Sequence, residues 1–534
     1  MEASSNLTTG GSDQVVSQRL NGIYGIYFFC LLVAIFSVAS TKLRAQFLYH
    51  ISGNALPGIR RIRGNALFGL LPRSCYRGLA STLEMLHGAA AEQGIAYGWM
   101  GINVLAVLRD PEIIRTTLSQ PDEVLSRTGG QRLWAPFSTL QRLIGDGLFS
   151  YVGEKAKVGR NALKSEFVHI ASLQEKFGYI LKTANNHTAN LKTKNVADGR
   201  RRDLERTVED FATDLLGRVL FGMEGTHVGN DELLPVSDRI GLMCASPSHT
   251  WRHAVNSMLL LNTREYQNHE ERKTGQKFEA LVQQRLLGMD ATNGSQEHER
   301  PVIQKISLST GGGTSKATLS RPAIEQARLS LFGGHHGIGL TLTWALLELS
   351  KNPNIVAKLR AEIRSAKLSS DSFPDFQSVY KRMPYLDAIL YETLRLYPTV
   401  HATVRALNTS YALTAVDGTP VVLNRGTIVY ISIYLLHREK SIWGPDADEF
   451  SPERFLREED AVKSNGYMPF GSGGRSCAGY QFALLAAKTF LIVLLGEWDV
   501  VIENAGEVKP HLTALCEPDR RIEFELRRAG KHAA

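Results

Sequence analysis

The chain has 534 residues, of which 43% are hydrophobic and 21% charged, so disordered, collagen-like and coiled-coil proteins are excluded. Its 61 Lys and Arg exceed its 53 Asp and Glu by 8, which fits a membrane surface or a docking patch better than a nucleic acid. The five cysteines are widely spaced and form no C-x-x-C pair, which argues against a disulfide framework and a structural zinc site.

The first element is an apolar segment that carries no charge between residues 20 and 41. About 20 helical residues cross a bilayer core of about 30 Å, so the segment predicts a transmembrane helix over residues 21–41. Basic residues follow it from Lys42 onward, whereas only Arg19 stands immediately before it, and the positive-inside rule places the C-terminal side in the cytosol. A cleaved signal peptide is the alternative.

This topology divides the chain into four regions. Residues 1–20 are expected to be a short lumenal N-terminus with a glycosylation sequon at Asn6. After the transmembrane helix, residues 42–59 form a basic linker that contains Pro and Gly, and residues 60–534 form one large domain.

Within the body, Asp110 and the proline after it predict the N-cap and first residue of a helix. Residues 289–316 are rich in Gly, Ser, Thr and Asn, which predicts a flexible surface connection. The longest helical pattern then begins near Ser320 and meets no further proline until Pro353. It spans about 30 residues, or about 45 Å at helical rise, so it must cross the interior of a large domain.

The middle of this long helix reads GGHHGIG over residues 333–339. Each of these four glycines weakens a helix by about 1 kcal/mol relative to alanine. A close approach of the backbone to a ligand would offset that loss, and a plain kink is the alternative.

The remaining pattern makes the chain predominantly helical with some strand. Further elements are predicted as helices over 355–367, 385–397 and 480–495 and as strands over 411–413, 420–423 and 427–433.

The strongest local pattern is FGSGGRSCAG over residues 470–479, directly before the predicted helix at 480. Cys477 therefore lies in a Gly-rich loop at a helix N-terminus, where the helix dipole and Arg475 favour a thiolate. With no second Cys or His beside it, this thiolate suits a single axial ligand of a metal better than a zinc site. A buried structural cysteine is the alternative.

Together with three further segments, this loop resembles the cytochrome P450 family of haem-thiolate monooxygenases, from about Arg60 to the end. The loop matches the pattern F-x-x-G-x-R-x-C-x-G at each fixed position. Residues 392–395 match E-x-x-R, residues 452–455 match P-E-R-F, and residues 331–344 are similar to the long distal helix that crosses the haem face. The resemblance implies the mainly helical P450 fold with a small β region, behind an N-terminal anchor.

The resemblance also implies haem b as the cofactor. Cys477 is then the proximal ligand of the haem iron. The amides of Ala478 and Gly479 would donate hydrogen bonds to its sulfur, and Phe470 would shield it.

Three arginines would neutralise the haem propionates by this resemblance: Arg160, Arg405 and Arg475. The W-x-x-x-R helix of the family has Ala156 at its Trp position, so one propionate or packing contact is absent. Gly334 belongs to the part of the distal helix that approaches the cofactor.

Three charged residues of the matched motifs, Glu392, Arg395 and Arg454, would form a buried structural network. Lys157 and Lys164 lie on the helix of Arg160 and would attract an acidic flavoprotein electron donor. A solvated basic face is an equally good interpretation of these two lysines.

The sequence departs from the family at the acid–alcohol pair of the distal helix, [AG]-G-x-[DE]-T, because His336 takes the acid's position and Gly337 the alcohol's. Three interpretations stay open. His336 donates the protons that oxygen activation needs, or a substrate hydroxyl or ordered water fills the space at Gly337, or the enzyme rearranges or dehydrates its substrate instead. Thr341, one turn beyond Gly337, is a substitute hydroxyl, and His335 is expected to be packed or solvated elsewhere.

The function implied is the use of O2 and reductase-delivered electrons to hydroxylate, epoxidise or desaturate a lipophilic small molecule, as a tailoring step of secondary metabolism. The implied partners are NADPH–cytochrome reductase or cytochrome b5 and the endoplasmic-reticulum membrane, with a cytosolic catalytic domain on a single span and no nucleic acid. The alternatives are a reductase-independent haem-thiolate isomerase or dehydratase, a general fatty-acid or xenobiotic hydroxylase, and a non-catalytic haem-binding protein.

Overall fold

The computed structural model describes residues 56, 58–61, 79–100, 103–126, 147–148, 151–198, 201–223, 269–288, 300–314, 319–366, 375–457, 466–513 and 515–529. The chain divides into two compact units, Met1–Pro57 and Gly58–Ala534, and every described helix and strand belongs to the second. The expected transmembrane helix, the sequon at Asn6 and almost all of the linker lie outside the described residues. None of the described helices is long and apolar enough to cross a bilayer.

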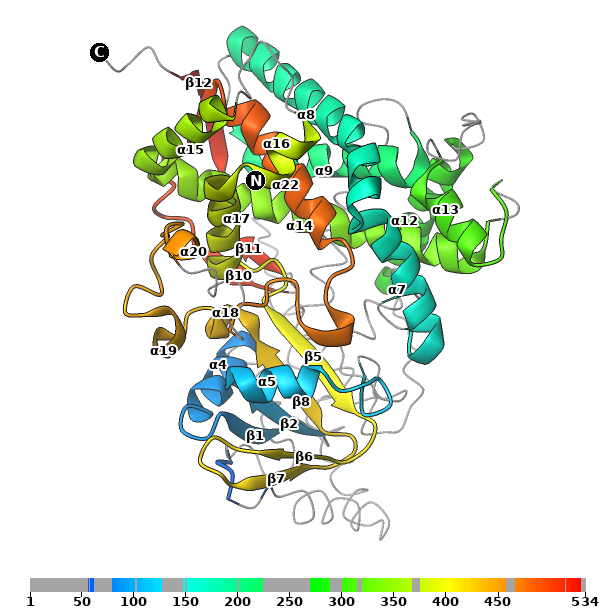
Figure 1. The fold of residues 1–534 in the computed structure, drawn as a ribbon, viewed down its shortest axis with the longest axis vertical. Helices are drawn as coiled ribbons and strands as arrows, with labels where there is room; N and C mark the ends of the chain where they lie inside the picture. Colours follow the sequence, from blue (N-terminus) through cyan, green and yellow to red (C-terminus); the bar gives the residue numbers. More distant parts are fainter. Residues whose placement is uncertain are drawn as a thin grey trace, which may run out of the picture. The chain divides into compact units, whose positions relative to one another are not determined.

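The second unit is mainly helical with small sheets, as expected (Figure 1). Its helices are α4 (Leu79–Ala89), α5 (Pro111–Leu118), α7 (Gly153–Phe167), α8 (Ile170–Asp198), α9 (Leu204–Phe221), α12 (His269–Gly288), α13 (Val302–Ser309), α14 (Arg321–Lys351), α15 (Pro353–Ser365), α16 (Phe376–Lys381), α17 (Pro384–Leu396), α18 (Ile433–Leu436), α19 (Lys440–Trp443), α20 (Arg454–Arg457), the 3₁₀ turn η5 (Gly473–Arg475) and α22 (Tyr480–Leu495). Its strands are β1 (Ile95–Met100), β2 (Asn103–Leu108), β3 (Leu125–Ser126), β4 (Arg202–Asp203), β5 (Ala402–Leu407), β6 (Tyr411–Thr414), β7 (Pro420–Leu423), β8 (Ile428–Ser432), β9 (Trp498–Val501), β10 (Pro510–Leu512), β11 (Cys516–Pro518) and β12 (Glu523–Arg528).

The largest described sheet has five strands in the order β1-β2-β8-β5-β3 and lies with α4 and α5 in the lower part of Figure 1. β2 pairs with β8 in parallel, with Leu105 opposite Ile428, and the other neighbours are antiparallel. All five residues of β8 are buried, as is typical of a central strand covered on both faces. The smaller sheets are β4-β12-β9, β6-β7 and β10-β11.

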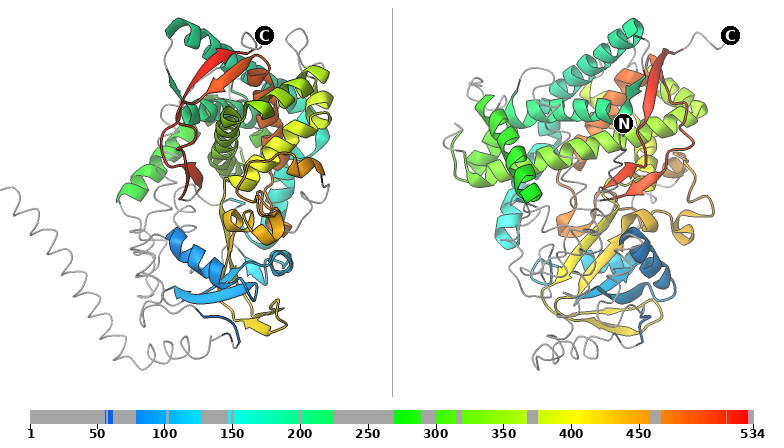
Figure 2. Two further views of the ribbon diagram at one scale, coloured as in Figure 1. Left: turned by 90° about the vertical axis from the view of Figure 1, so that its left-hand side faces the viewer. Right: turned by 180° about the vertical axis from the view of Figure 1, so that it is seen from behind.

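The predicted long helix is present as α14, with 31 residues. Its N-cap is Ser320, whose hydroxyl accepts a hydrogen bond from the Ala323 amide at 3.3 Å, so the predicted start is confirmed. The Asp110 cap is confirmed as well, because its carboxylate accepts from the amide of Ile113 at 2.9 Å. Figure 2 shows α14 crossing the helical region, where the core is continuous from α9 through α14 to α22.

Two of the four glycines in the middle of α14 contact another helix. A Cβ added at Gly334 would lie 2.8 Å from Leu216 Cδ1, and one added at Gly339 would lie 2.8 Å from Glu209 Cγ. Both neighbours belong to α9, so these two glycines allow a close helix–helix contact. No described side chain or neighbouring backbone lies within 4 Å of a Cβ added at Gly333 or Gly337. Helix packing therefore accounts for two of the four glycines, where we expected a ligand.

The predicted flexible connection at 289–316 is wrong in part, because it contains α13. Val302, Ile303 and Ile306 of this helix are buried in the main core. These apolar residues recur at helical spacing and form one buried face of α13. Burial of this face stabilises the helix although the composition of the segment is typical of loops.

The predicted strand at 427–433 ends earlier than expected, because its last residue opens the short helix α18. Ser432 caps that helix, with its hydroxyl accepting from the Leu435 amide at 3.2 Å. β5 was not predicted, and its role is to connect α17 to the centre of the sheet.

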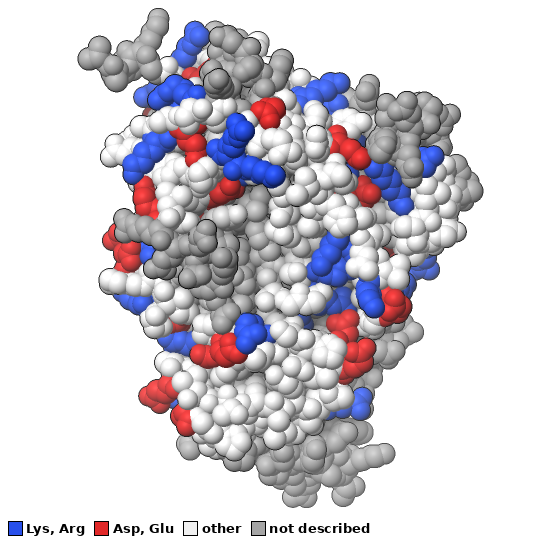
Figure 3. Space-filling model, in the orientation of Figure 1, with Lys and Arg blue, Asp and Glu red and all other residues white. Residues whose placement is uncertain are grey.

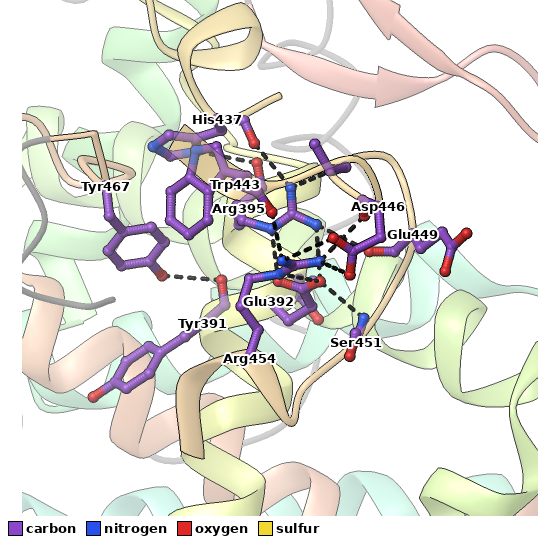
Figure 4. A network of polar contacts seen from close by, with 12 residues as sticks. Tyr391, Glu392, Arg395, His437, Trp443, Asp446, Glu449, Ser451, Arg454 and Tyr467 are labelled. Carbon is purple, nitrogen blue, oxygen red and sulfur yellow. Dashed lines mark hydrogen bonds and ion pairs between the residues drawn. The ribbon is translucent and has the colours of Figure 1, made fainter. Parts of the chain in front are cut away.

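A buried ion pair joins two side chains of α17 (Figure 4). Arg395 donates from Nε and Nη2 to the two carboxylate oxygens of Glu392 at 2.7 and 2.8 Å, and both side chains are fully buried. The guanidinium also donates to the carbonyls of His437, Ala447 and Glu449. Since each of these bonds has a charged donor, this one side chain fixes a long irregular segment to α17.

Arg454 lies at the edge of the same network (Figure 4). Its Nε is 3.7 Å from Glu392 Oε1, and its Nη2 pairs with Asp446 at 2.9 Å. Its Nη1 donates to the Trp443 carbonyl at 2.7 Å. The structure thus brings Glu392 and Arg395 of the E-x-x-R motif together with Arg454 of the P-E-R-F motif.

The network generates a first prediction. Glu392→Gln leaves the Arg395 guanidinium buried without its counter-charge, so the free energy of unfolding should fall by about 3–5 kcal/mol. The matched control is Glu453→Gln, since the side chain of Glu453 pairs with Lys358 and is 26% exposed, and the loss there should stay below about 1 kcal/mol. Denaturant unfolding of both variants measures the difference, and equal losses would contradict a stabilising network.

Candidate functional site

Cys477 lies between η5 and α22, in a loop held by its own backbone. The Cys477 amide donates to the Phe470 carbonyl at 2.8 Å, and the Gly479 amide donates to Cys477 Sγ at 3.4 Å. Ala478 is buried beneath the loop, whereas Cys477 is exposed. A sulfur that accepts a backbone N–H at a helix N-terminus is in the setting that stabilises a thiolate.

The glycines of this loop place it against α5. Gly471 and Gly473 have φ of 71° and 68°, in the left-handed region. A Cβ added at Gly473 would lie 2.1 Å from the carbonyl oxygen of Leu118, at the end of α5. Glycine is therefore required at position 473 for two reasons: the left-handed backbone conformation and the contact with a neighbouring backbone.

Three arginines from different elements surround the loop. Arg160 of α7 donates to the carbonyl and, at 3.3 Å, to the hydroxyl of Ser476. Arg475 pairs with Asp122 through Nε at 2.9 Å. Arg405 of β5 is 5% exposed and donates to the Thr403 hydroxyl and to its neighbouring carbonyl.

These arginines share one electrostatic neighbourhood. Burial, and then the charge of Arg475, lowers the pKa of Arg405 to about 10, so it stays charged at neutral pH. The pKa of Arg160 is lowered by burial and then by Arg475, while Cys477 and Asp122 act to raise it. Among the described residues, Asp122 pairs with Arg475 and interacts electrostatically with Arg160 and Arg405, so one carboxylate is shared by three guanidinium groups. A ligand with two carboxylates would complement them.

Leu148 and Tyr151 connect the cysteine loop to α14. Arg475 donates to the carbonyls of Leu148 and Tyr151 at 3.3 and 2.8 Å. On the other side, the Leu148 amide donates to the Gln326 side chain at 3.3 Å, and the Tyr151 hydroxyl donates to the Glu325 carboxylate. The loop and the long helix, which are far apart in sequence, are therefore parts of one site.

One face of α14 is open. Ser330, Gly333 and Gly337 follow each other at i, i+3 and i+7, so they lie on the same side of the helix. Gly333 is exposed and the other two are half-buried, although residues 338–349 are buried. We call these three residues the open face. Thr341 lies one turn farther along, and its hydroxyl donates to the Gly337 carbonyl at 2.7 Å.

The two histidines of α14 are buried next to this face. His335 is fully buried, with Nδ1 2.7 Å from the Leu331 carbonyl, and it is packed as expected. His336 is 4% exposed, and its ring contacts those of His335 and Phe332 at centroid distances of 4.0 and 5.4 Å. Burial lowers the pKa of His336 to about 4, so its imidazole is neutral at pH 7.

Two acidic residues of the site were not predicted. Asp122 pairs with Arg475, and Glu209 of α9 places Oε1 3.4 Å from His336 Nδ1. Burial raises the pKa of Glu209, and the charge of His335 opposes this shift. The sequence offered only a weak signal for Glu209, namely an acidic residue beside Val208 on a helix whose buried residues are mostly apolar.

The outer face of α7 carries the lysines proposed to attract an electron donor. Lys157 is exposed and lies 3.9 Å from Glu154, and Lys164 is half-buried. Basic and acidic side chains are interspersed over the face shown in Figure 3. Docking through these two lysines stays a prediction.

The cysteine loop generates a second prediction. Gly473→Ala requires a strained φ and drives a methyl group into the Leu118 carbonyl, so the protein should lose about 2–4 kcal/mol of stability. The adjacent Gly474→Ala is the control, because nothing lies within 4 Å of its added Cβ. Thermal or denaturant unfolding of both variants checks this, and a Gly473→Ala variant as stable as the control would contradict it.

A third prediction concerns acid stability. The folded pKa of His336, about 4, lies below the 6.5 of an ordinary histidine, so the unfolded chain takes up this proton first as the pH falls. The contribution is complete above pH 6.5 and is lost between there and about pH 4, in total by about 3 kcal/mol. In His336→Phe, the free energy of unfolding should fall less steeply over this interval than in the wild type. Parallel curves would refute the assignment.

Comparison with known proteins agrees with this site. A family model described as Cytochrome P450 matches residues 79–525. The chain is 37% identical to a cytochrome P450 of Arthroderma benhamiae over 185 residues, which are 33% of this chain and 37% of that protein. It is 28% identical to cytochrome P450 52A3-A of Candida maltosa over 449 residues, 77% of this chain and 80% of that protein. It is 26% identical to cytochrome P450 monooxygenase claO of Ampulloclitocybe clavipes over 414 residues, which are 70% of this chain and 74% of that protein.

The match with the Arthroderma protein thus spans less than two fifths of its length, whereas the Candida match spans most of both chains. The family model covers most of the chain, including Cys477 and all three arginines. The protein therefore belongs to the cytochrome P450 family, whose members bind haem b.

Proposed function

We propose that the protein is a haem-thiolate monooxygenase that uses O2 and electrons from NADPH–cytochrome reductase to hydroxylate, epoxidise or desaturate a lipophilic small molecule. The observation that carries the proposal is the exposed Cys477 thiol at the N-terminus of α22, beside three arginines that face one carboxylate. This donor set fits haem b, because it supplies one thiolate for the iron and guanidinium groups for the two propionates.

When bound, haem supplies the redox chemistry that activates O2, and its thiolate ligand promotes O–O cleavage. Cys477 would hold the iron, with the Gly479 amide donating to the sulfur. Arg160, Arg405 and Arg475 would orient the cofactor by its carboxylates. Arg475 already pairs with Asp122, so a propionate would share or replace that partner.

Proton delivery is assigned to the residues beside the open face. His336 is neutral at pH 7 and can give up a proton at Nε2 when another proton reaches Nδ1. Thr341 places a hydroxyl one turn beyond Gly337. The free space at the Gly337 Cβ position also supports the alternative in which water or a substrate hydroxyl takes the place of the missing alcohol.

The biological setting rests on the sequence. The uncharged segment 21–41 supports a single-pass anchor in the endoplasmic-reticulum membrane with a cytosolic catalytic domain. The loss of the usual acid–alcohol pair supports a specialised biosynthetic step over general hydroxylation of fatty acids. It also keeps a reductase-independent isomerase or dehydratase as the second candidate.

The fourth prediction tests the thiolate. Cys477→Ala should abolish the haem-thiolate absorbance and the NADPH-dependent turnover of the purified full-length chain. Cys516→Ala is the matched control, because Cys516 is buried and burial raises the pKa of its thiol to about 12. The control should keep both properties, and a Cys477→Ala variant that keeps them would refute the proposed ligand.

Deletion of the gene in its source organism, followed by metabolite profiling, separates the two candidate reactions. A product heavier by one oxygen or lighter by two hydrogens than the accumulating compound supports monooxygenation. An equal mass, or the loss of water, supports the isomerase or dehydratase and overturns the proposal.

A further inference from the structure

The carboxylate missing from α14 is supplied by another helix. The family pattern has an acid at the position of His336, and here Glu209 of α9 reaches the same place. Its Oε1 lies 3.4 Å from His336 Nδ1. Glu209 is 8% exposed and His336 4%, so both groups are shielded from water. An acid and a histidine from two helices thus occupy the position that the family fills with one side chain.

Two glycine contacts hold α9 in this place. Gly339 follows His336 at i+3, and a Cβ there would lie 2.8 Å from Glu209 Cγ and 3.5 Å from Glu209 Cα. Gly334 precedes the histidine, and a Cβ there would meet Leu216 of α9 at 2.8 Å. The helices therefore approach closely on both sides of His336. A larger residue at position 339 would push the Glu209 stem away from the imidazole.

Charges around the pair come from three elements. Burial is the largest effect on Glu209 and raises its pKa. His335 of α14 and Arg206 of α9 lower this pKa, whereas Asp203, which precedes α9, raises it. Glu517 of β11 also interacts with Glu209. Although the facing atoms lie at ion-pair distance, burial acts against a separated carboxylate and imidazolium. Burial therefore shifts Glu209 toward its protonated form and keeps the His336 imidazole neutral at pH 7.

A neutral imidazole cannot serve as a proton donor alone. It carries one N–H, and the anion left by losing that proton is far too basic to form at pH 7. It donates at one nitrogen only when a proton arrives at the other. His336 has its Nδ1 directed to Glu209, so its Nε2 lies on the side of the ring away from that carboxyl group. His336 also precedes Gly337 by one residue, about 100° around the helix from the open face.

We propose that Glu209 acts through His336 as its proton source, and that the two residues form a relay to the open face of α14. This inference rests on the proposed monooxygenase function. In the forward step the Nε2–H bond of His336 breaks and its proton passes to an acceptor at the open face, while the Glu209 O–H bond breaks and an Nδ1–H bond forms. Glu209 becomes a carboxylate and the imidazole stays neutral. In the reset, Nε2 takes one proton from a donor at the open face and the Nδ1 proton returns to Glu209.

The fifth prediction follows from the stoichiometry of O2 reduction. Reduction to water takes four electrons and four protons, and release of hydrogen peroxide takes two of each, so slow proton delivery favours peroxide. Glu209→Gln keeps the size of the side chain and an N–H donor toward Nδ1 but carries no transferable proton. With a microsomal NADPH–cytochrome reductase and no organic substrate, it should raise the peroxide released per NADPH several-fold, as should His336→Gln.

Three further variants make this measurement specific. Glu209→Asp retains an acid and should restore part of the wild-type ratio. The double variant Glu209→Gln/His336→Gln should release no more peroxide than either single variant, because one relay is already broken. The control is Asp214→Asn, an acid on the same helix that pairs at 2.7 Å with His187 of α8 instead of α14. It should keep the wild-type ratio. Additive effects, or an unchanged ratio in Glu209→Gln, would overturn the relay.

A second readout needs no turnover. The infrared difference spectrum of wild-type protein minus Glu209→Gln at pH 7 should contain a carboxylic-acid band, and nitrogen NMR should show His336 protonated at Nε2. A carboxylate band, or protonation at Nδ1 alone, would refute the relay. If the wild type consumes no NADPH, the monooxygenase function itself fails, and the infrared and NMR spectra still decide whether the acid–imidazole pair exists.

Discussion

The site depends on the buried pair between Glu392 and Arg395, because that pair fixes the chain that leads to the cysteine. Arg395 binds the carbonyl of His437, and the His437 ring accepts at Nε2 from the Met468 amide at 2.9 Å and contacts the Arg395 carbonyl through Nδ1 at 3.0 Å. Burial lowers the pKa of His437 to about 3, so the ring is neutral and its Nδ1–H donates to that carbonyl. Two residues later, Phe470 accepts from the Cys477 amide. The Arg395 guanidinium is thus linked through the His437 ring and the backbone near Met468 and Phe470 to the loop that holds the sulfur.

The two sides of the site differ in the charge that they carry. On the cysteine side, guanidinium groups are gathered in excess and tolerate burial because Asp122, carbonyls and hydroxyls take up their donors. On the side of α14, burial removes charge, so that His336 and Glu209 favour their neutral forms. Surplus positive charge suits the fixed recognition of an anionic ligand, whereas neutral partners suit the movement of a proton.

The sequence predicted what depends on local pattern. Helix caps such as Ser320 and the Gly-rich loop around Cys477 are set by residues close together in the chain, and α14, α17 and α22 were placed within a residue or two. The pairing of Glu209 with His336 could not be predicted, because it depends on how closely α9 packs against α14. The same holds for Asp122, whose partner is 353 residues away. Helix α13 was missed because its short apolar pattern lies within a loop-like composition.

The contact between Gly339 and Glu209 has a consequence for how such a site can change in evolution. Because the stem of Glu209 fills the space of the missing side chain, a mutation at position 339 is tolerated only if residue 209 becomes smaller or withdraws. Withdrawal would separate the carboxyl group from His336 and break the proposed relay. Positions 209, 336 and 339 are therefore sterically coupled across two helices.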